Sequence, residues 1–478
     1  MLWLGVHLPD LPLAIFLRGG RVAEPVAVSH GQGREQRVLI ANREAMRQGV
    51  RPGMRVSAAH ALVQGLRVQA QDARVERAAL EHLAAWCGQF TSLVSLVPPQ
   101  ALLLEVQGSL TLFGGLEALL ERLRRGLAGL GYRARLTAAP TPLAATWLAR
   151  AGGEARITTN AALAGALSRL PLSGIDPAEA QIQMLRRMGI GTIGDILRLP
   201  RAGLARRFGK DLVLALDRAL GSAPDPRAPY VAPATFEAAL VIPGAVDNTE
   251  GLLFPLNRLI QELCGILTAR MAGVAALTLT LRHPRSAPTR IELGLVAATR
   301  DARHLTELFR ERLTRVTLPE PVEEMALAAA QMVPLALVHH QDFFAPKRAT
   351  LQAKAELIER LRSRLGNAAV QGIRPIAEHR PELAWRYTEP GESGATVDTG
   401  ERPLWLFPEP VAIEIRNGWP WLGEQLTLEG SRERIESGWW DGRDIARDYF
   451  IARNRRGECL WIYRELATQS WWLHGVFG

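Results

Sequence analysis

The sequence predicts a multi-domain α+β protein that ends in a small, mainly β domain. Three observations predict this fold class. The chain has 478 residues, too many for one compact core when a domain usually holds roughly 100 to 200. Its first part alternates short apolar strand patterns with helical patterns. Nine of its twelve tryptophans lie within residues 385–478, among glycine and proline turns.

Composition narrows the class of protein. The formal net charge is +9 and the sequence pI is near 10.1, which favours a polyanionic partner. The three cysteines, Cys87, Cys264 and Cys459, are too far apart in sequence to indicate a disulfide framework or a cysteine-rich zinc site. The N-terminus lacks the pattern of a signal peptide, and no apolar run approaches the ~20 residues of a membrane span. We therefore expect a cytoplasmic protein without a membrane partner.

Residues 1–165 form the first predicted block. Period-two and continuous apolar patterns predict strands, and apolar residues spaced by three and four predict helices. The expected strands are Leu2–Leu8, Val38–Ala41, Gln100–Val106 and Arg133–Ala138, and the expected helices are Arg74–Cys87 and Leu116–Leu130.

The middle of the chain changes character twice. Residues 166–228 contain short helical runs interrupted by glycines and end in the proline-rich linker APDPRAPYVAP. Residues 229–338 return to an α+β pattern. Its expected strands are Phe236–Ile242, Ala275–Arg282 and Arg290–Val296, and its expected helices are Leu252–Ala269 and Arg303–Arg315.

The C-terminal part begins with a break at residues 339–346. A helix is expected over Ala349–Leu365, followed by strands such as Val411–Arg416 and Leu460–Tyr463. Residues 347–478 thus form the last predicted block, a partner-binding region with a mainly β domain.

Three stretches of the first block, taken in order, resemble the palm and fingers of Y-family translesion DNA polymerases. LWLGVHLPD is similar to the opening strand of that family, which ends in a metal-binding Asp. IANREAMRQGVRPGM, residues 40–54, matches the fingers pattern AN-Tyr-x-A-Arg-x-x-GV-x-x-GM. PPQALLLEVQGSLTLFGG, residues 98–115, falls where the family has Ser-Leu-Asp-Glu-Ala-Tyr-Leu-Asp-Val. Further on, APTPLAATWLARAG resembles the helix that closes the palm, and MGIGTIGDILRLPRAGLARRFG looks like the thumb.

The resemblance implies a right-hand fold: palm and fingers over residues 1–165, with fingers at about 12–75, a thumb with a helix-hairpin-helix over 166–228, and a little finger over 229–338. It also implies that the chemistry is lost. Y-family polymerases hold two divalent ions with carboxylates, and the matching positions here are His7, Gln100 and Ala101. The Tyr and Arg that contact the incoming nucleotide are Arg43 and Met46. We therefore expect no polymerase activity and no metal or cofactor.

The retained parts predict DNA-backbone contacts. A helix-hairpin-helix offers the amides of a glycine turn to a phosphate without reading sequence. The expected contacts in the thumb are Gly189, Gly191 and Gly194 on the turn, with Arg186, Arg187, Arg206, Arg207 and Lys210 nearby. Those in the little finger are Arg282, Arg285, Arg290 and Arg300. The alternative for the thumb is ordinary helix capping beside a solvated basic face.

A short segment after the little finger resembles a sliding-clamp-binding peptide. Gln341, Asp342, Phe343 and Phe344 follow the form Gln-Leu-x-Leu-Phe, one residue short and without the leucine. Such peptides insert apolar side chains into a pocket while the glutamine fixes their register. The alternative is a loop whose phenylalanines pack on a neighbouring domain.

The tail resembles the C-terminal region of a non-catalytic branch of the family, the pseudo-polymerase subunit of the bacterial damage-inducible mutasome. RPLWLFPEP, residues 402–410, and the final WWLHGVFG are part of this likeness. The resemblance implies three protein partners: a sliding clamp, a RecA-like accessory subunit and an error-prone C-family polymerase. The paired tryptophans Trp439, Trp440, Trp471 and Trp472 have the composition of interface anchors. Alternatively they form the core of the β domain, or stack on single-stranded DNA.

The leading hypothesis is a non-catalytic adaptor in error-prone translesion synthesis, acting in the SOS response to DNA damage at the nucleoid. Two alternatives remain open at this point. One is an active translesion polymerase with unconventional ligands such as His7, Asp10 and Glu105. The other is a nucleic-acid-binding module whose tail reads single strands and which has no polymerase partner.

Overall fold

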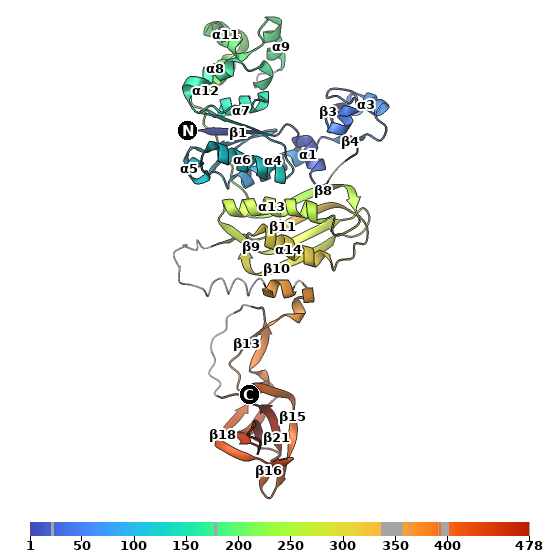
Figure 1. The fold of residues 1–478 in the computed structure, drawn as a ribbon, viewed down its shortest axis with the longest axis vertical. Helices are drawn as coiled ribbons and strands as arrows, with labels where there is room; N and C mark the ends of the chain where they lie inside the picture. The colour runs from blue at the N-terminus through green and yellow to red at the C-terminus, as the bar shows by residue number, and fades with distance from the viewer. Residues whose placement is uncertain are drawn as a thin grey trace. The chain divides into compact units, whose positions relative to one another are not determined.

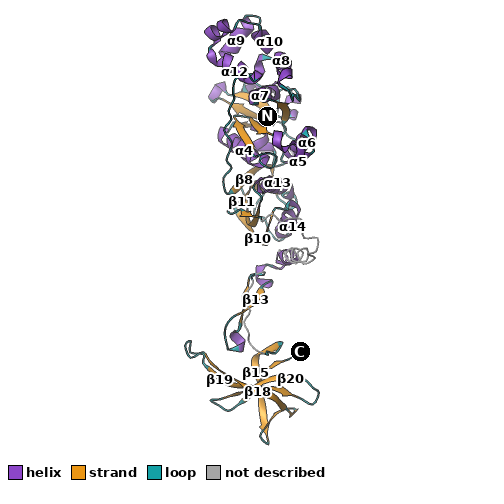
Figure 2. Ribbon diagram, turned by 90° about the vertical axis from the view of Figure 1, so that its left-hand side faces the viewer, coloured by secondary structure: helices purple, strands orange, loops and turns teal. Residues whose placement is uncertain are grey.

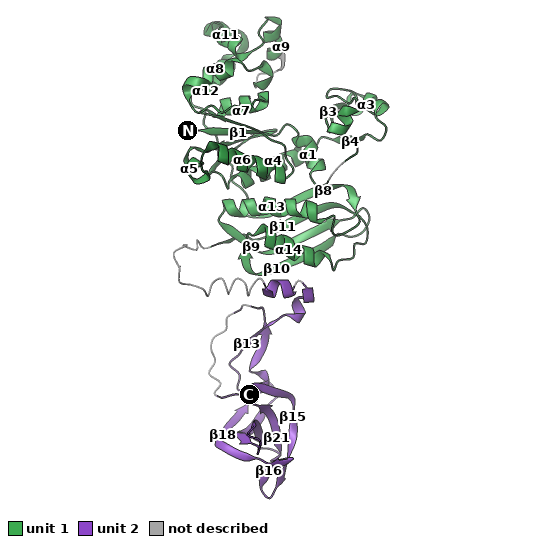
Figure 3. Cartoon of the chain, viewed as in Figure 1, with its two compact units in different colours: residues 1–349 green, residues 350–478 purple. Residues whose placement is uncertain are grey.

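The computed structural model describes residues 1–20, 23–175, 179–335, 357–362, 364–390, 392 and 401–477. The chain divides into two compact units, Met1–Ala349 and Thr350–Gly478 (Figure 3). The expected mixture of strands and helices in the first unit and of strands in the second is confirmed. Within the described residues, no helix combines the length and apolar character needed to cross a bilayer.

The palm is built on a four-stranded antiparallel sheet with the order β5-β6-β1-β7. Its strands are β1 (Trp3–His7), β5 (Leu93–Val97), β6 (Ala101–Glu105) and β7 (Arg135–Ala139). Its helices are α1 (Leu11–Leu17), α4 (Ala73–Cys87), α5 (Leu110–Phe113), α6 (Leu116–Gly129) and α7 (Pro142–Ala151). These bounds confirm the strands and helices expected there to within a few residues.

Strand β1 alternates its side chains between two cores. Leu2, Leu4 and Val6 join the core formed with α4 and α6, whereas Trp3 joins the core formed with α7. On the α7 side, Gly5 is close to the helix: a Cβ there would lie 2.3 Å from the carbonyl oxygen of Ala145. Helices therefore cover both faces of the palm sheet, with α7 on one side and α4 and α6 on the other (Figure 1).

The fingers form a small separate core. Their sheet has the order β3-β2-β4, in which β2 and β4 are parallel. The elements are β2 (Val26–His30), β3 (Arg37–Ala41), α2 (Arg43–Arg47), α3 (Val56–Leu62) and β4 (Arg67–Ala70).

The thumb is helical (Figure 2). Its elements are α8 (Asn160–Ser168), α9 (Glu179–Arg187), α10 (Ile193–Leu197), α11 (Arg201–Phe208) and α12 (Lys210–Leu220). The proline-rich tract after α12 is anchored to the palm, since Tyr230 N donates to Val94 O at 2.7 Å. Residues 223–233 have no helix or strand, as expected of a linker.

The little finger packs α13 (Leu253–Ala269) and α14 (Ala302–Leu313) on one face of an antiparallel sheet with the order β10-β9-β11-β8. The strands are β8 (Phe236–Val246), β9 (Ala272–Arg282), β10 (Thr289–Thr299) and β11 (Val322–Ala329), with β12 (Val333–Pro334) paired to β9. The expected strands and helices are confirmed here.

Palm and little finger share one apolar core. Trp86 of α4 lies against α13 so closely that a Cβ on Gly265 would be 2.1 Å from its indole ring. Beside this contact, the buried carboxylate of Glu262 accepts from Arg18 Nη1 at 2.8 Å and lies 2.8 Å from His82 Nδ1. Arg18 caps the C-terminus of α1, His82 lies in α4 and Glu262 lies in α13, so one ionic cluster joins three helices.

The second unit is dominated by a seven-stranded antiparallel sheet with the order β17-β16-β15-β21-β20-β19-β18. Its strands are β15 (Trp405–Arg416), β16 (Trp419–Leu422), β17 (Glu424–Gln425), β18 (Thr427–Ser437), β19 (Ile445–Arg453), β20 (Cys459–Glu465) and β21 (Trp471–Val476). A hairpin of β13 (Gly372–Pro375) and β14 (Trp385–Thr388) precedes it, and residues 357–362 are helical. The mainly β tail is thus confirmed.

We predict that Glu262→Gln destabilises the first unit by about 3 to 5 kcal/mol, because the buried Arg18 loses its counter-charge. Urea unfolding followed by tryptophan fluorescence measures this change. Glu324→Gln, which breaks the exposed pair of Arg282 and Glu324 (N–O 3.0 Å), is the matched control and should cost less than about 1 kcal/mol. Equal effects of the two substitutions would contradict the role given to the buried cluster.

The same carboxylate gives stability a dependence on pH. Burial alone raises the pKa of Glu262, but Arg18 and His82 outweigh it and lower the pKa from 4.5 to about 2. Because the folded state binds this proton less tightly than the unfolded state, the contribution is complete above the unfolded pKa. It is lost as pH falls from about 4.5 toward 2. Glu262→Gln should flatten the unfolding free energy over this range.

Candidate functional site

The three positions expected to have lost metal ligands lie together at one end of the palm sheet. His7 ends β1 and is the register partner of Ala101, the first residue of β6. Gln100 comes immediately before, and its carbonyl oxygen accepts from Leu8 N at 2.8 Å. The side chains at this junction are an imidazole, an amide and a methyl group.

Arginines surround this junction. Burial, then the nearby charges of Arg135 and Arg150, lower the pKa of His7 to about 4, so the imidazole is neutral at pH 7. His7 Nδ1 is buried and has no hydrogen-bond partner. Arg135 is the register partner of His7 on β7 and donates from Nη1 to the carbonyl oxygen of Arg150 at 3.3 Å. A divalent cation here would meet positive charge where it needs carboxylates.

The nearest alternative carboxylates do not converge on this point. Asp10 is paired with Arg133, whose Nε lies 3.1 Å from Oδ2. Glu105 is the register partner of Trp3, four residues along the strands from the pair of His7 and Ala101. That separation is about 13 Å at ~3.3 Å per residue. Throughout the described part of the chain, no three His, Cys, Asp or Glu side chains are grouped closely enough to hold a metal ion.

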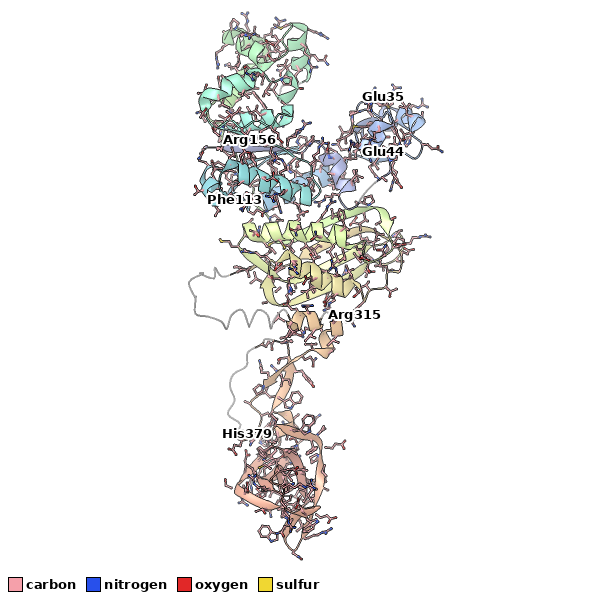
Figure 4. The ribbon with its side chains drawn as sticks, in the orientation of Figure 1. Glu35, Glu44, Phe113, Arg156, Arg315 and His379 are labelled. Carbon is pink, nitrogen blue, oxygen red and sulfur yellow. The ribbon has the colours of Figure 1, made fainter. Side chains whose placement is uncertain are left out.

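The fingers motif builds a compact turn. Asn42 caps α2, since its Oδ1 accepts from Ala45 N at 2.9 Å. Arg43 is the first residue of α2, and Met46 on the same helix is 40% exposed. Arg47 forms an ion pair with Glu44 at 3.5 Å, in the fingers as labelled in Figure 4. The motif thus has a structural role, while the two positions expected to have lost nucleotide contacts hold an exposed arginine and an exposed thioether.

The thumb turn already holds an anion of its own. Gly191 N and Thr192 N donate to Asp195 Oδ2 at 3.1 and 2.9 Å, and Asp195 N donates back to Thr192 Oγ1. The bond from the Thr192 hydroxyl, followed by those from the two amides, lowers the pKa of Asp195. These amides therefore take part in capping α10, which is the alternative that the sequence left open for the thumb. A phosphate that bound here would have to displace the carboxylate of Asp195.

One expected turn residue needs correction. Gly194 lies inside α10 and is buried, rather than on the turn with Gly189 and Gly191. A Cβ at Gly194 would lie 2.7 Å from the carbonyl oxygen of Ser168, so this glycine permits close packing with the end of α8. Gly189 does form the turn, with φ of +77°.

The basic side chains of the thumb are exposed. Arg186 and Arg187 lie in the last turn of α9, Arg206 and Arg207 in the last turn of α11, and Lys210 begins α12. Arg206 and Arg207 also border an apolar pocket of about 380 Å³ lined by Met188, Leu204 and Phe208. These charges, unlike the turn amides, are accessible to a phosphate backbone.

The little-finger arginines are partly neutralised. Arg282 pairs with Glu324 at 3.0 Å, and Arg285 pairs with Glu320 at 3.8 Å. Arg290 and Arg300 are exposed near the two ends of β10. The positive potential of this region is therefore weaker than the count of arginines suggests.

The two tryptophan pairs of the tail differ in exposure. Trp439 is 82% and Trp440 58% exposed, in the loop between β18 and β19. Trp471 and Trp472 lie in β21 and are half-buried, and Trp471 stacks on Phe450 with ring centroids 5.3 Å apart. The first pair faces solvent, whereas the second packs against the apolar cores of the β domain. The residues expected to bind the sliding clamp, Gln341, Asp342, Phe343 and Phe344, lie outside the described residues.

Sequence reasoning missed Arg380, whose side chain is 4% exposed and whose guanidinium supports the loop of Trp439 and Trp440. Its partner Asp441 is 61 residues away in sequence, so no local pattern reveals the contact. The Asp195 cap, in contrast, has a visible signal: Thr192 followed three residues later by an acidic side chain at a helix start.

Comparisons with known proteins agree with this architecture. Residues 22–150 match the model of the impB/mucB/samB family. Protein ImuB of Caulobacter vibrioides (strain NA1000 / CB15N) is 29% identical over 463 residues, covering 90% of this chain and all of that protein. DNA polymerase IV of Yersinia pestis is 28% identical over 191 residues, covering 39% of this chain and 54% of the polymerase.

Two solved structures are similar to part of the chain. DinB from Sulfolobus solfataricus is 17% identical and covers 70% of this chain, with a TM-score of 0.39. A binary complex of Dbh DNA polymerase is 16% identical over the same share, with a TM-score of 0.41. The likeness to ImuB extends into the second unit, while the likeness to DNA polymerase IV covers 39% of the chain. The chain is thus similar to Protein ImuB over most of its length, its residues 22–150 match the impB/mucB/samB family, and it ends in a mainly β region.

Proposed function

We propose that the chain is a non-catalytic adaptor in error-prone translesion DNA synthesis. In this role it binds primed or damaged DNA and the sliding clamp. It also recruits an error-prone C-family polymerase and a RecA-like accessory subunit. The observation that carries the proposal is the junction of His7, Gln100 and Ala101, where the family's carboxylates are replaced and Arg135 and Arg150 lie nearby. Two-metal phosphoryl transfer requires carboxylate ligands at this place.

The geometry argues against the active-polymerase alternative. Glu105 lies at the opposite end of the paired strands from His7, and Asp10 is engaged by Arg133. Three ligands for one ion must lie within about 2 to 2.5 Å of it, a condition that these side chains do not meet. An adaptor needs none of them, because tethering raises the local concentration of a polymerase without new chemistry.

DNA binding in this proposal rests on exposed side chains rather than on the turn amides, because Asp195 occupies Gly191 N and Thr192 N. Such binding is independent of sequence and falls steeply with salt. We place the main contact on the thumb arginines, with a weaker share from Arg290 and Arg300. The same proposal places the activity of the protein at the nucleoid during the SOS response to DNA damage.

Recruitment is the direct test of the adaptor role. Clamp is loaded on a primed template, and retention of the labelled C-family polymerase is measured with and without this chain. We expect the chain to increase retention at least tenfold, because each tethered contact adds effective concentration. Equal retention in both samples would mean that the chain does not act as an adaptor.

We predict that Arg206→Ala with Arg207→Ala lowers affinity for duplex DNA several-fold at low salt. The slope of log affinity against log salt should fall by about 2, since each lost phosphate contact removes roughly 0.9. Fluorescence anisotropy over a salt series measures both values. Arg455→Ala with Arg456→Ala, an adjacent exposed pair in the second unit, removes the same charge and should leave the slope unchanged. Identical slopes in all three proteins would remove the thumb from the interface.

The clamp segment has its own prediction. Phe343→Ala with Phe344→Ala should abolish measurable binding to the sliding clamp, because both apolar anchors of the peptide are removed. Surface plasmon resonance on immobilised clamp reports the affinity, and DNA binding by the same preparation controls for folding. Unchanged clamp affinity would refute the assignment of this segment.

A further inference from the structure

The loop between β18 and β19 presents two tryptophans on a rigid base. Trp439 and Trp440 are 82% and 58% exposed, and their rings meet edge to face with centroids 5.6 Å apart. Large exposed aromatic side chains next to each other are rare on surfaces without a binding role. Their exposure therefore calls for a structural support on the protein and for a partner that covers the two rings.

The side chain of Arg380 supports this loop through hydrogen bonds and a contact with the Trp440 ring. Its guanidinium donates to Asp441 Oδ1 at 2.9 Å, to the Arg443 carbonyl oxygen at 3.2 Å and to Glu378 Oε2 at 2.8 Å. Its Cζ also lies 5.5 Å from the centre of the Trp440 ring. The side chain is 4% exposed, so these bonds form in a shielded environment where they are stronger than at the surface.

The turn before the tryptophans is equally constrained. Gly438 has φ of +94°, and a Cβ there would lie 2.4 Å from the Arg443 carbonyl oxygen and 2.7 Å from Arg380 Nη1. Asp441 Oδ1 accepts from Arg443 N at 3.0 Å and closes the far side of the loop. A loop ordered in advance loses little conformational entropy on binding, as expected of an interface anchor.

Charge decides which kind of partner fits. The loop, its flanks and the segment packed on it, residues 436–447 and 378–382, hold more acidic than basic side chains. The carboxylates are Glu378, Glu382, Glu436, Asp441 and Asp444, and the guanidiniums are Arg380, Arg443 and Arg447. Five against three gives a local charge of −2 in a chain whose net charge is +9. Such a surface repels a phosphate backbone, so single-stranded DNA is disfavoured although the rings could stack on bases.

We propose that Trp439 and Trp440 insert into an apolar pocket, bordered by lysine or arginine, on a protein partner. The pocket covers the rings, and its basic rim meets Glu436 and Asp444. Arg380 is a positioning residue, because it touches the loop and not the partner. This inference deepens the proposed adaptor function, on which it rests, by assigning its protein contact to one loop.

The test uses the full chain with two probes, the C-family polymerase and the RecA-like subunit from the same organism. Trp439→Ala with Trp440→Ala should weaken binding of at least one probe tenfold or more, while affinity for DNA is unchanged. Trp405→Ala removes a 66% exposed tryptophan from β15 in the same unit and should leave both affinities as they are. Glu436→Lys with Asp444→Lys should weaken the same probe several-fold at low salt.

Arg380→Lys separates positioning from general stability. In the wild-type background it should weaken partner binding several-fold. In the Trp439→Ala, Trp440→Ala background it should have no further effect, whereas a merely structural role would weaken binding again.

Each contrary result has a distinct meaning. Wild-type affinity in the tryptophan double variant overturns this inference alone, and loss of DNA binding in that variant would assign the loop to nucleic acid. Loss of self-association would make a second copy the occupant and also overturn the inference. A wild-type chain that binds neither probe overturns both the inference and the adaptor function.

Discussion

Strand β1 is the constraint on which the first unit depends. It lies between β6 and β7, and it sends Leu4 and Val6 into one core and Trp3 into another. The first core continues through α4 into α13 of the little finger, and the second continues through α7 into the thumb. A single alternating strand therefore connects the two halves of the unit. Its last residue, His7, belongs to neither of these two apolar cores.

Because of this arrangement, the residues at the strand ends can change without altering the two apolar cores that hold the fold together. The positions expected to have lost their carboxylates, His7, Gln100 and Ala101, lie at strand ends, and none of them belongs to either of these two apolar cores. Removing a cluster of like charges also removes repulsion that only bound metal would offset. In the proposed function, the frame keeps exposed thumb arginines for sequence-independent DNA contact and exposed side chains for protein contact. An adaptor can be built on these features alone.

Much of the fold could be predicted from local pattern, because strands and helices of this chain follow clear apolar periods. The palm strands, α4, α6 and the little-finger elements appear within a few residues of their expected bounds. Contacts between distant residues could not be predicted: Arg18 meets Glu262 across 244 positions, and Arg380 meets Asp441 across 61. The phosphate contact expected on the thumb turn stays a prediction, and the sequence did not lead us to expect that Asp195 already accepts from the amides of Gly191 and Thr192. Composition also could not predict that Trp439 and Trp440 are exposed whereas Trp471 and Trp472 are half-buried.

The most direct test of a polymerase-like frame without polymerase chemistry is primer extension by the purified chain alone, with Mg²⁺ and with Mn²⁺. A gel shift on the same sample verifies that DNA is bound. A His7→Ala preparation made in parallel identifies contaminating polymerases, whose activity would be equal in both samples. We expect DNA to be retained and no primer to be extended above that level with either metal. Extension by the wild-type chain that His7→Ala abolishes would contradict the account, because it would show that this junction still performs metal-dependent nucleotide addition.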